Sequence, residues 1–137
     1  MNVGEGMRCR TGSRRHPGAL YSRATAATHQ NERCRVFLVR RIFKVKKGTA
    51  RKAAKLITQI GEMYEKAGQR TPSRVYISGG GVPGPADTVY MEWTEEALRS
   101  AYREQNPVPP GMDPVYAELR ELQEETFIEF YDLYSGS

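Results

Sequence analysis

Arg41 is a charged residue in the middle of an apolar strand pattern. It interrupts the alternation of the β-branched and aromatic run Val36–Val45. A guanidinium in such a place must either form an ion pair or face a wet pocket, because an unpaired buried charge is costly. Glu92 and Glu129, on the strands expected to flank this one, are candidate partners, and we favour the ion pair. Without it, Arg41 is placed to bind an anionic substrate or to stabilise a developing enolate.

Aromatic side chains supply the other groups that could do chemistry. Tyr90 and Trp93 lie on one predicted strand, and with Arg41 they are the residues we predict to be catalytic if the protein is an enzyme. The hydroxyl and amide groups expected to contact a ligand belong to Tyr64, Tyr102, Tyr116 and Asn106. All of these residue types also serve in cores, sheets and turns, so their presence alone does not distinguish binding from packing.

Metal, haem and nucleophilic chemistry lack their usual side chains in most of the chain. Histidine and cysteine occur only at Cys9, His16, His29 and Cys34. Their spacings match no zinc module, and after residue 34 there is no His or Cys to serve as an axial haem ligand and no Ser–His or Cys–His pair. We therefore predict no metal site and no cofactor.

The net charge of +5 is concentrated at the start of the sequence. In residues 1–35 seven arginines outnumber two glutamates by five, so the remaining 14 basic and 14 acidic residues cancel. A neutral domain has little general attraction for phosphate backbones. The aromatic pattern of RNA-binding domains with a similar strand order is also missing. We predict no nucleic-acid partner.

Residues 1–34 are predicted to be a disordered, Arg-rich N-terminal tail. They carry few large apolar groups and show no helical or strand periodicity. The composition resembles a transit peptide, but no amphipathic helix is evident, so we favour a disordered extension or translated upstream sequence from a misplaced start codon. No apolar run is long enough for a secretory signal or a membrane span, and no disulfide framework is implied. We predict a cytoplasmic location and no membrane partner.

Residues 35–137 are predicted to form one α+β domain. Apolar and aromatic runs predict strands at 36–45, 74–78, 87–93 and 126–134. Apolar residues at three- and four-residue spacing predict helices at about 49–66, 94–105 and 113–125. Gly68 is expected to end the first of these helices, and Leu98 is expected to face inward from the second. The order β-α-β-β-α-α-β is the split β-α-β plan, with a four-stranded antiparallel sheet and helices on one face.

Both faces of this sheet are expected to be apolar. On the first strand, Val39 and Phe43 point to one face while Leu38 and Ile42 point to the other. The predicted helices can cover one face only. The second face is best covered by the same face of another copy, which predicts a two-fold homodimer. The alternative is a monomer in which Lys, Arg and Tyr side chains shield that face.

Three stretches resemble proteins of the dimeric α/β-barrel superfamily, in particular its antibiotic-biosynthesis monooxygenase and NIPSNAP groups. Arg41–Gly48 is similar to their first strand and helix entry, Tyr90–Leu98 to their third strand and following helix, and Asp113–Glu125 to their last helix. The resemblance implies a ferredoxin-like fold, sheet-to-sheet dimerisation and a pocket between sheet and helices. It selects no activity, because the superfamily includes cofactor-free oxygenases, haem-degrading enzymes, isomerases and members without known chemistry.

Three functions remain open at this point, and the residues do not decide whether the protein is an enzyme. We favour a dimer that binds a small apolar or aromatic ligand. The second is a cofactor-independent monooxygenase or isomerase that acts on an aromatic or polyketide-like substrate, with Arg41, Trp93 and a tyrosine holding an enolate or phenolate. The third is an interaction module whose Arg-rich tail contacts acidic partners.

Overall fold

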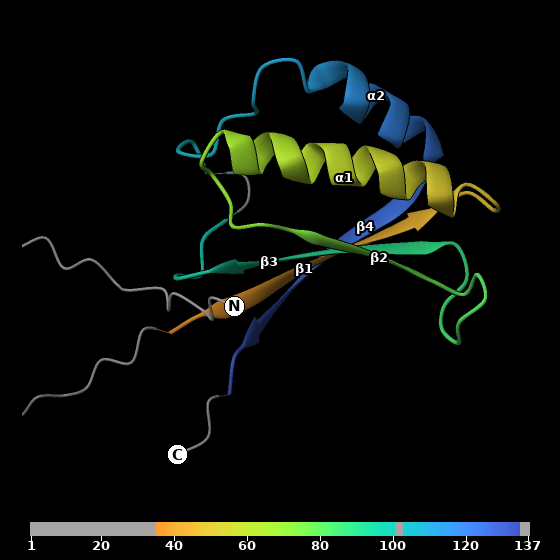
Figure 1. Ribbon diagram of the computed structural model, residues 1–137, viewed down its shortest axis with the longest axis horizontal. Helices are drawn as coiled ribbons and strands as arrows, with labels where there is room; N and C mark the ends of the chain where they lie inside the picture. Colours follow the sequence, from red (N-terminus) through yellow and green to blue (C-terminus); the bar gives the residue numbers. More distant parts are fainter. Residues whose placement is uncertain (1–34, 101–102, 135–137) are drawn as a thin grey trace, which may run out of the picture. The chain divides into compact units, whose positions relative to one another are not determined.

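The computed structural model describes residues 35–100 and 103–134, so the predicted tail lies outside the described residues. The elements are β1 (Phe37–Val45), α1 (Ala50–Lys66), β2 (Arg74–Ser78), β3 (Thr88–Glu95), α2 (Asp113–Leu122) and β4 (Gln123–Asp132). The strands form one antiparallel sheet in the order β2-β3-β1-β4. Both helices lie on the same side of this sheet (Figure 1). The predicted ferredoxin-like α+β fold is therefore confirmed.

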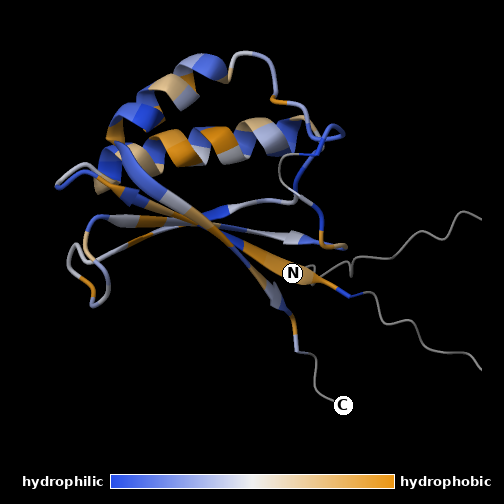
Figure 2. Cartoon of the chain, turned by 180° about the vertical axis from the view of Figure 1, so that it is seen from behind, coloured by the Kyte–Doolittle hydropathy of each residue, from blue (hydrophilic) through white to orange (hydrophobic). Residues whose placement is uncertain are grey.

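The core lies between the helices and the inner face of the sheet. Strand alternation places odd-numbered residues of β1 and β3 on this face, and α1 turns its apolar stripe toward them (Figure 2). The buried apolar residues of these three elements are Val39, Phe43, Val45, Ala53, Leu56, Ile57, Ile60, Tyr64, Val89, Met91 and Trp93. Full burial of each large side chain stabilises the fold by roughly 1.5–3 kcal/mol.

Helix α1 ends in a glycine turn that determines where the next residues lie. Gly68 adopts φ 70°, a left-handed conformation that favours glycine, and its N–H donates to the Glu65 carbonyl at 2.9 Å. The next N–H, of Gln69, donates to the Tyr64 carbonyl at 3.0 Å. This turn keeps Gln69 and Arg70 beside the last turn of the helix. The predicted C-terminal glycine is confirmed.

The predicted helix at 94–105 is wrong. Strand β3 continues to Glu95, because Thr94 and Glu95 pair with β1, and the Thr94 N–H donates to Thr71 Oγ1 at 3.0 Å instead of starting a helix. The described residues after Glu95 form bends and a turn up to residue 106. Leu98, which was expected to face inward, is 61% exposed. Tertiary pairing of the strand has overridden a local helix signal.

The boundaries of α2 and β4 also differ from the predicted ones. The N-cap of α2 is Met112, so Asp113 is the first helical residue and Pro114 the second, where a missing N–H costs nothing. Helix α2 stops at Leu122 and β4 starts immediately at Gln123, three residues earlier than predicted. A register shift in the β1–β4 pairing between Lys44 and Val45 accommodates this early start.

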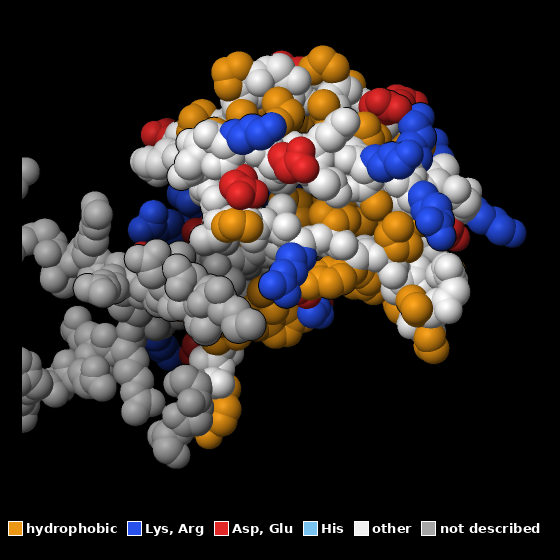
Figure 3. All heavy atoms as spheres, in the orientation of Figure 1, with side chains coloured by type: hydrophobic (Ala, Val, Ile, Leu, Met, Phe, Trp, Pro, Cys, Tyr) orange, Lys and Arg blue, Asp and Glu red, His pale blue; other side chains and the backbone are white. Residues whose placement is uncertain are grey.

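The outer face of the sheet carries exposed aromatic rings beside charged residues and, within the described ranges, no helix or strand covers it (Figure 1). Tyr76, Phe127 and Tyr131 on this face are 43%, 46% and 40% exposed. On the side of the molecule drawn in Figure 3, hydrophobic side chains also reach the surface along the sheet below the helices. Neither described helix is long and apolar enough to cross a membrane.

Candidate functional site

A pocket of about 520 Å³ opens between the inner face of the sheet and the helices. Arg41 and Phe43 of β1 form one wall, and Tyr64 of α1, with Tyr116 and Leu119 of α2, forms another. Arg70 and the segment from Arg103 to Val108 also contribute to the lining. The split β-α-β fold thus brings together residues more than 70 positions apart in the sequence.

Arg41 faces this pocket without a carboxylate partner among the described residues. Its Nε donates a long hydrogen bond of 3.4 Å to Thr126 Oγ1, and its Cζ lies 5.2 Å from the centroid of the Phe43 ring. The predicted ion pair with Glu92 or Glu129 is wrong. Both glutamates are aligned with Arg40 in the strand pairing, and they therefore lie on the outer face of the sheet.

Arg70 enters the pocket from the connection between α1 and β2. Its Cζ lies 3.8 Å from the centroid of the Tyr64 ring and 4.4 Å from that of Trp93, distances typical of cation–π contacts. The pKa of the Arg70 guanidinium is lowered, first by burial, which disfavours its charge, and also by the like charge of Arg41. Among residues 35–100 and 103–134, no carboxylate lies within ion-pair distance of Arg70.

Tyr64 and Tyr116 share a hydrogen bond inside the pocket. Their hydroxyl oxygens lie 3.4 Å apart, and either one can donate. Burial of the Tyr116 hydroxyl, together with its bond to Tyr64, raises the pKa of Tyr116 to about 12. The Tyr116 hydroxyl therefore remains protonated near neutral pH, where it can act as a hydrogen-bond donor and not as a base.

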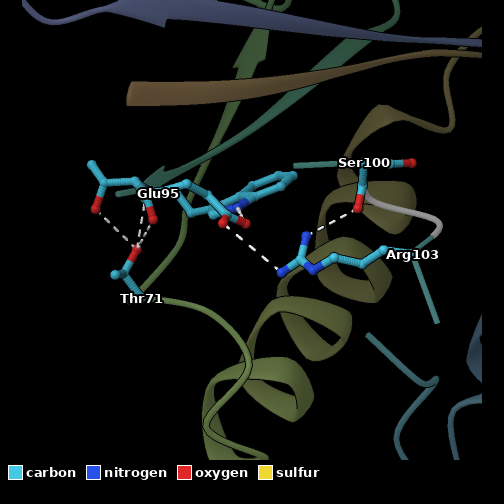
Figure 4. Close-up of polar contacts among 6 residues, drawn as sticks. Thr71, Glu95, Ser100 and Arg103 are labelled. Carbon is cyan, nitrogen blue, oxygen red and sulfur yellow. Dashed lines mark hydrogen bonds and ion pairs between the residues drawn. The ribbon is translucent and has the colours of Figure 1, made fainter. Parts of the chain in front are cut away.

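Arg103, which also lines the pocket, is held differently from Arg41 and Arg70. Figure 4 shows its guanidinium between Ser100 and Glu95. It donates to the Ser100 carbonyl at 2.9 Å and lies 3.9 Å from a Glu95 carboxylate oxygen. The other Glu95 oxygen accepts a hydrogen bond of 3.1 Å from the Trp93 indole N–H. The charge of Arg103 and the polar atom of Trp93 are thus both engaged within the protein.

The structure brings together four of the seven residues predicted to form a site. Arg41, Tyr64, Tyr116 and Asn106 line the same pocket. Trp93 lies in the core behind Arg70 and lines only a small neighbouring void. Tyr90 is aligned with Ile42 on the outer face of the sheet, so the three predicted catalytic residues do not converge in one protomer. Tyr102 lies outside the described residues.

Three further arginines of the pocket, Arg70, Arg103 and Arg120, were not predicted. Arg70 follows a helix C-terminus, where a basic residue is usually solvated, and no local pattern marks it as inward-facing. Arg120 lies on the exposed side of α2 at the pocket edge. With Arg41 they give four arginines around the pocket, against the acidic residues Glu104 and Asp113. In the part of the chain that the structure describes, no three His, Cys, Asp or Glu side chains gather to hold a metal ion.

No protein-family model matches this chain, and no curated protein matches it by sequence. Several solved structures match its fold. A NIPSNAP family protein with unknown function from Agrobacterium tumefaciens str. C58 is 17% identical, with a TM-score of 0.59 over 77% of this chain and 94% of that one. A dimeric protein of unknown function and ferredoxin-like fold from Bacteroides fragilis NCTC 9343 is 12% identical, with a TM-score of 0.51 over 72% and 96%.

A third similar structure is SnoaB from Streptomyces nogalater, which is a cofactor-independent oxygenase. It is 12% identical and has a TM-score of 0.50 over 76% of this chain and 96% of that one. At such low identity these likenesses establish the fold, and they confirm the resemblance to NIPSNAP proteins and to an oxygenase of the same fold. The function must be argued from the pocket itself.

Proposed function

We propose that this protein is a homodimer in which each protomer binds a small, largely aromatic ligand in the pocket between sheet and helices. The observation that carries this proposal is the pocket of about 520 Å³, which falls within the roughly 300–1,000 Å³ of ligand-binding cavities. Phe43, Tyr64, Tyr116 and Leu119 offer ring faces and apolar surface along its walls. A few polar groups among them can orient the ligand.

The dimer part of the proposal is supported by the outer face of the sheet. Arg40 and Glu92 form an ion pair there, and the Arg40 guanidinium lies 5.2 Å from the centroid of the Tyr131 ring. Exposed rings of Tyr76 and Phe127 lie on the same face. A second copy placed on this face would remove these rings from water. The similar protein from Bacteroides fragilis is described as dimeric.

Native mass spectrometry of the purified full chain tests both parts at once. We expect a dimer mass that carries a bound small molecule, which is lost when the protein is denatured. Tyr116→Trp should fill the pocket and abolish the added mass. Tyr134→Trp, at a position that is 90% exposed, should retain it. A monomer that carries no ligand after gentle purification and binds none from an aromatic compound library would contradict the proposal.

A cofactor-independent oxygenase is the second candidate, and Arg41 is the observation that favours it. An oxygenase of this type must hold a reduced aromatic substrate as a phenolate or enolate, and Arg41 with the protonated Tyr116 hydroxyl can stabilise that oxyanion. The electrons that reduce oxygen come from the substrate ring itself. Trp93 would act only as a wall behind Arg70, and Tyr90 would have no role within the protomer.

Oxygen uptake with 1,4-dihydroxynaphthalene as substrate tests this second candidate. Enzymatic uptake should exceed autoxidation in buffer and should fall in Arg41→Gln, while Arg51→Gln, at an exposed position on α1, should keep it. If oxygen uptake with this and related hydroquinones is no faster than in buffer, the oxygenase candidate is contradicted. Ligand binding without oxygenation would then be the function.

A further inference from the structure

Two guanidinium groups reach the same pocket from different elements, and neither forms an ion pair with a carboxylate of the described residues. Arg41 comes from β1 and Arg70 from the α1–β2 connection. Two other cations of β1 are paired with acids: Arg40 with Glu92, and Lys44 with Glu125. Arg41 and Arg70 differ from these two because they are half-buried at the pocket and have no ion-pair partner among the described residues.

The proximity of these two positive charges destabilises the protein when the pocket holds no ligand. Like charges that face one half-buried space repel each other more strongly than they would in water. The pKa of Arg70 is lowered first by burial of its guanidinium, and the like charge of Arg41 acts in the same direction. A positive pocket of this kind is stabilised when an anion enters it and pairs with both groups.

Aromatic rings hold the two guanidinium groups in place without using their hydrogen-bond donors. Arg70 lies over the Tyr64 and Trp93 rings, and Arg41 lies over the Phe43 ring. A ring contacts the face of a guanidinium, whereas its five N–H groups point outward in the plane. Among the described residues, Arg41 donates a hydrogen bond only through its Nε, to Thr126. The remaining N–H groups are available to a planar acceptor.

The tyrosine pair supplies one more donor. Tyr64 and Tyr116 have two hydroxyl protons between them, and their mutual hydrogen bond uses one. The second proton is free to be donated into the pocket, from whichever hydroxyl acts as acceptor within the pair.

We infer that the ligand of this pocket is an aromatic or otherwise largely apolar molecule with a planar oxyanion, a carboxylate or an enolate, held by Arg41 and Arg70 and by one tyrosine hydroxyl. The inference rests on the proposed function, because it names the chemical class of the ligand in the same pocket. A planar acid matches the guanidinium fork, and the rings of Phe43 and Tyr116 receive the apolar body.

Isothermal titration calorimetry of the full chain with 2-naphthoate and with its neutral analogue 2-naphthamide tests the inference. We expect 2-naphthoate to bind at least about tenfold more tightly than 2-naphthamide. Arg41→Gln and Arg70→Gln should each weaken 2-naphthoate binding roughly ten- to hundredfold, the range for a hydrogen bond to a charged group, and leave 2-naphthamide nearly unaffected. Arg51→Gln removes the same charge from an exposed position and should change neither affinity.

The possible outcomes separate the two proposals. If 2-naphthoate and 2-naphthamide bind equally well and the arginine variants change neither affinity, the pocket is still a ligand site. The inference that its ligand is an anion would then be overturned. Binding of neither compound would overturn both. If a Gln variant fails to fold by circular dichroism, Arg41→Lys and Arg70→Lys replace it. These variants keep the charge but lose the planar fork, so binding of 2-naphthoate should still weaken; unchanged binding in both would overturn the inference.

Discussion

Arg40 and Arg41 are consecutive residues on β1 whose guanidinium groups lie on opposite faces of the sheet, in opposite electrostatic surroundings. Arg40 Nη2 lies 2.6 Å from Glu92 Oε1 on the outer face. Arg41, on the inner face, has a hydroxyl partner in Thr126 and no carboxylate partner in the described part of the chain. Arg40 is therefore neutralised by a carboxylate of the neighbouring strand, whereas Arg41 can pair with a ligand.

This difference predicts different effects on stability. Arg40→Gln leaves the Glu92 carboxylate, which is only 16% exposed, without its ion-pair partner. The free energy of unfolding should fall by about 1–3 kcal/mol. Arg41→Gln removes a charge that repels Arg70, so the free energy of unfolding should change by less than about 0.5 kcal/mol or rise. Urea unfolding of both variants measures this difference; an equal loss in the two would contradict it.

The proposed dimer predicts that a charge placed on the outer face separates the protomers. Phe127 is 46% exposed on this face, and Phe127→Asp would place a carboxylate at the interface without a partner. Sedimentation velocity should show a dimer for the full chain and a monomer for Phe127→Asp. Val82→Asp, in the β2–β3 connection, introduces the same charge at a 58% exposed position and should remain dimeric. A full chain that sediments as a monomer at high concentration rules the dimer out.

The β2–β3 connection predicts a strong contrast between two neighbouring glycines. Gly79 has φ 78°, and a Cβ there would lie 2.5 Å from the Ala86 Cα. Gly79→Ala should therefore lower the free energy of unfolding by about 1–3 kcal/mol. Gly80 has open space around it, so Gly80→Ala should be neutral or stabilising by up to about 1 kcal/mol. Thermal unfolding of the two variants provides the comparison. Similar melting temperatures would show that the β2–β3 connection can shift to accommodate a Cβ at position 79.

The tyrosine pair predicts a loss of stability at alkaline pH. In the unfolded chain Tyr116 releases its proton near its ordinary pKa of 10.0, whereas the folded protein retains that proton until about pH 12. Between these values the unfolded state binds fewer protons, so the free energy of unfolding falls as pH rises. Below pH 10 this contribution is fully present.

Absorbance of tyrosinate near 295 nm measures the same titration directly. One of the eight tyrosines should ionise late, near pH 12, and this late component should disappear in Tyr116→Phe. Tyr134→Phe, at a 90% exposed position, should leave this late component in place. If both variants lose the same part of the curve, the raised pKa of Tyr116 is refuted.

Local patterns in the sequence were sufficient to predict the strands of the sheet and most of the core residues. Alternation along β1 and β3 predicted which residues share a face of the sheet, because successive side chains on a strand point to opposite sides. Val39, Met91 and Trp93 are all buried on the inner face, in agreement with this rule. The spacing of apolar residues in α1 and the glycine at its end also predicted the helix and its termination.

The helix predicted at 94–105 shows where a local pattern fails. Thr94 followed by acidic residues is a good helix start by itself. In the folded chain Thr94 instead pairs with Leu38 and contacts Thr71, and these partners are distant in the sequence. A pattern within a short stretch of sequence cannot show that strand pairing with distant residues will compete with the helix.

The sequence by itself determined the fold class, the residues that share each face of β1, and the presence of Arg41 on the same face as Val39 and Phe43. Only the tertiary structure decided which acid pairs with Arg40, why Arg41 has none, and that Arg70 joins it in one pocket. Secondary structure depends on repeats of two to four residues, whereas the electrostatic surroundings of a side chain depend on strand register and on turns that bring distant residues together. The Gly68 turn and the pairing of β1 with β3 set these surroundings, and both act through contacts that the fold creates.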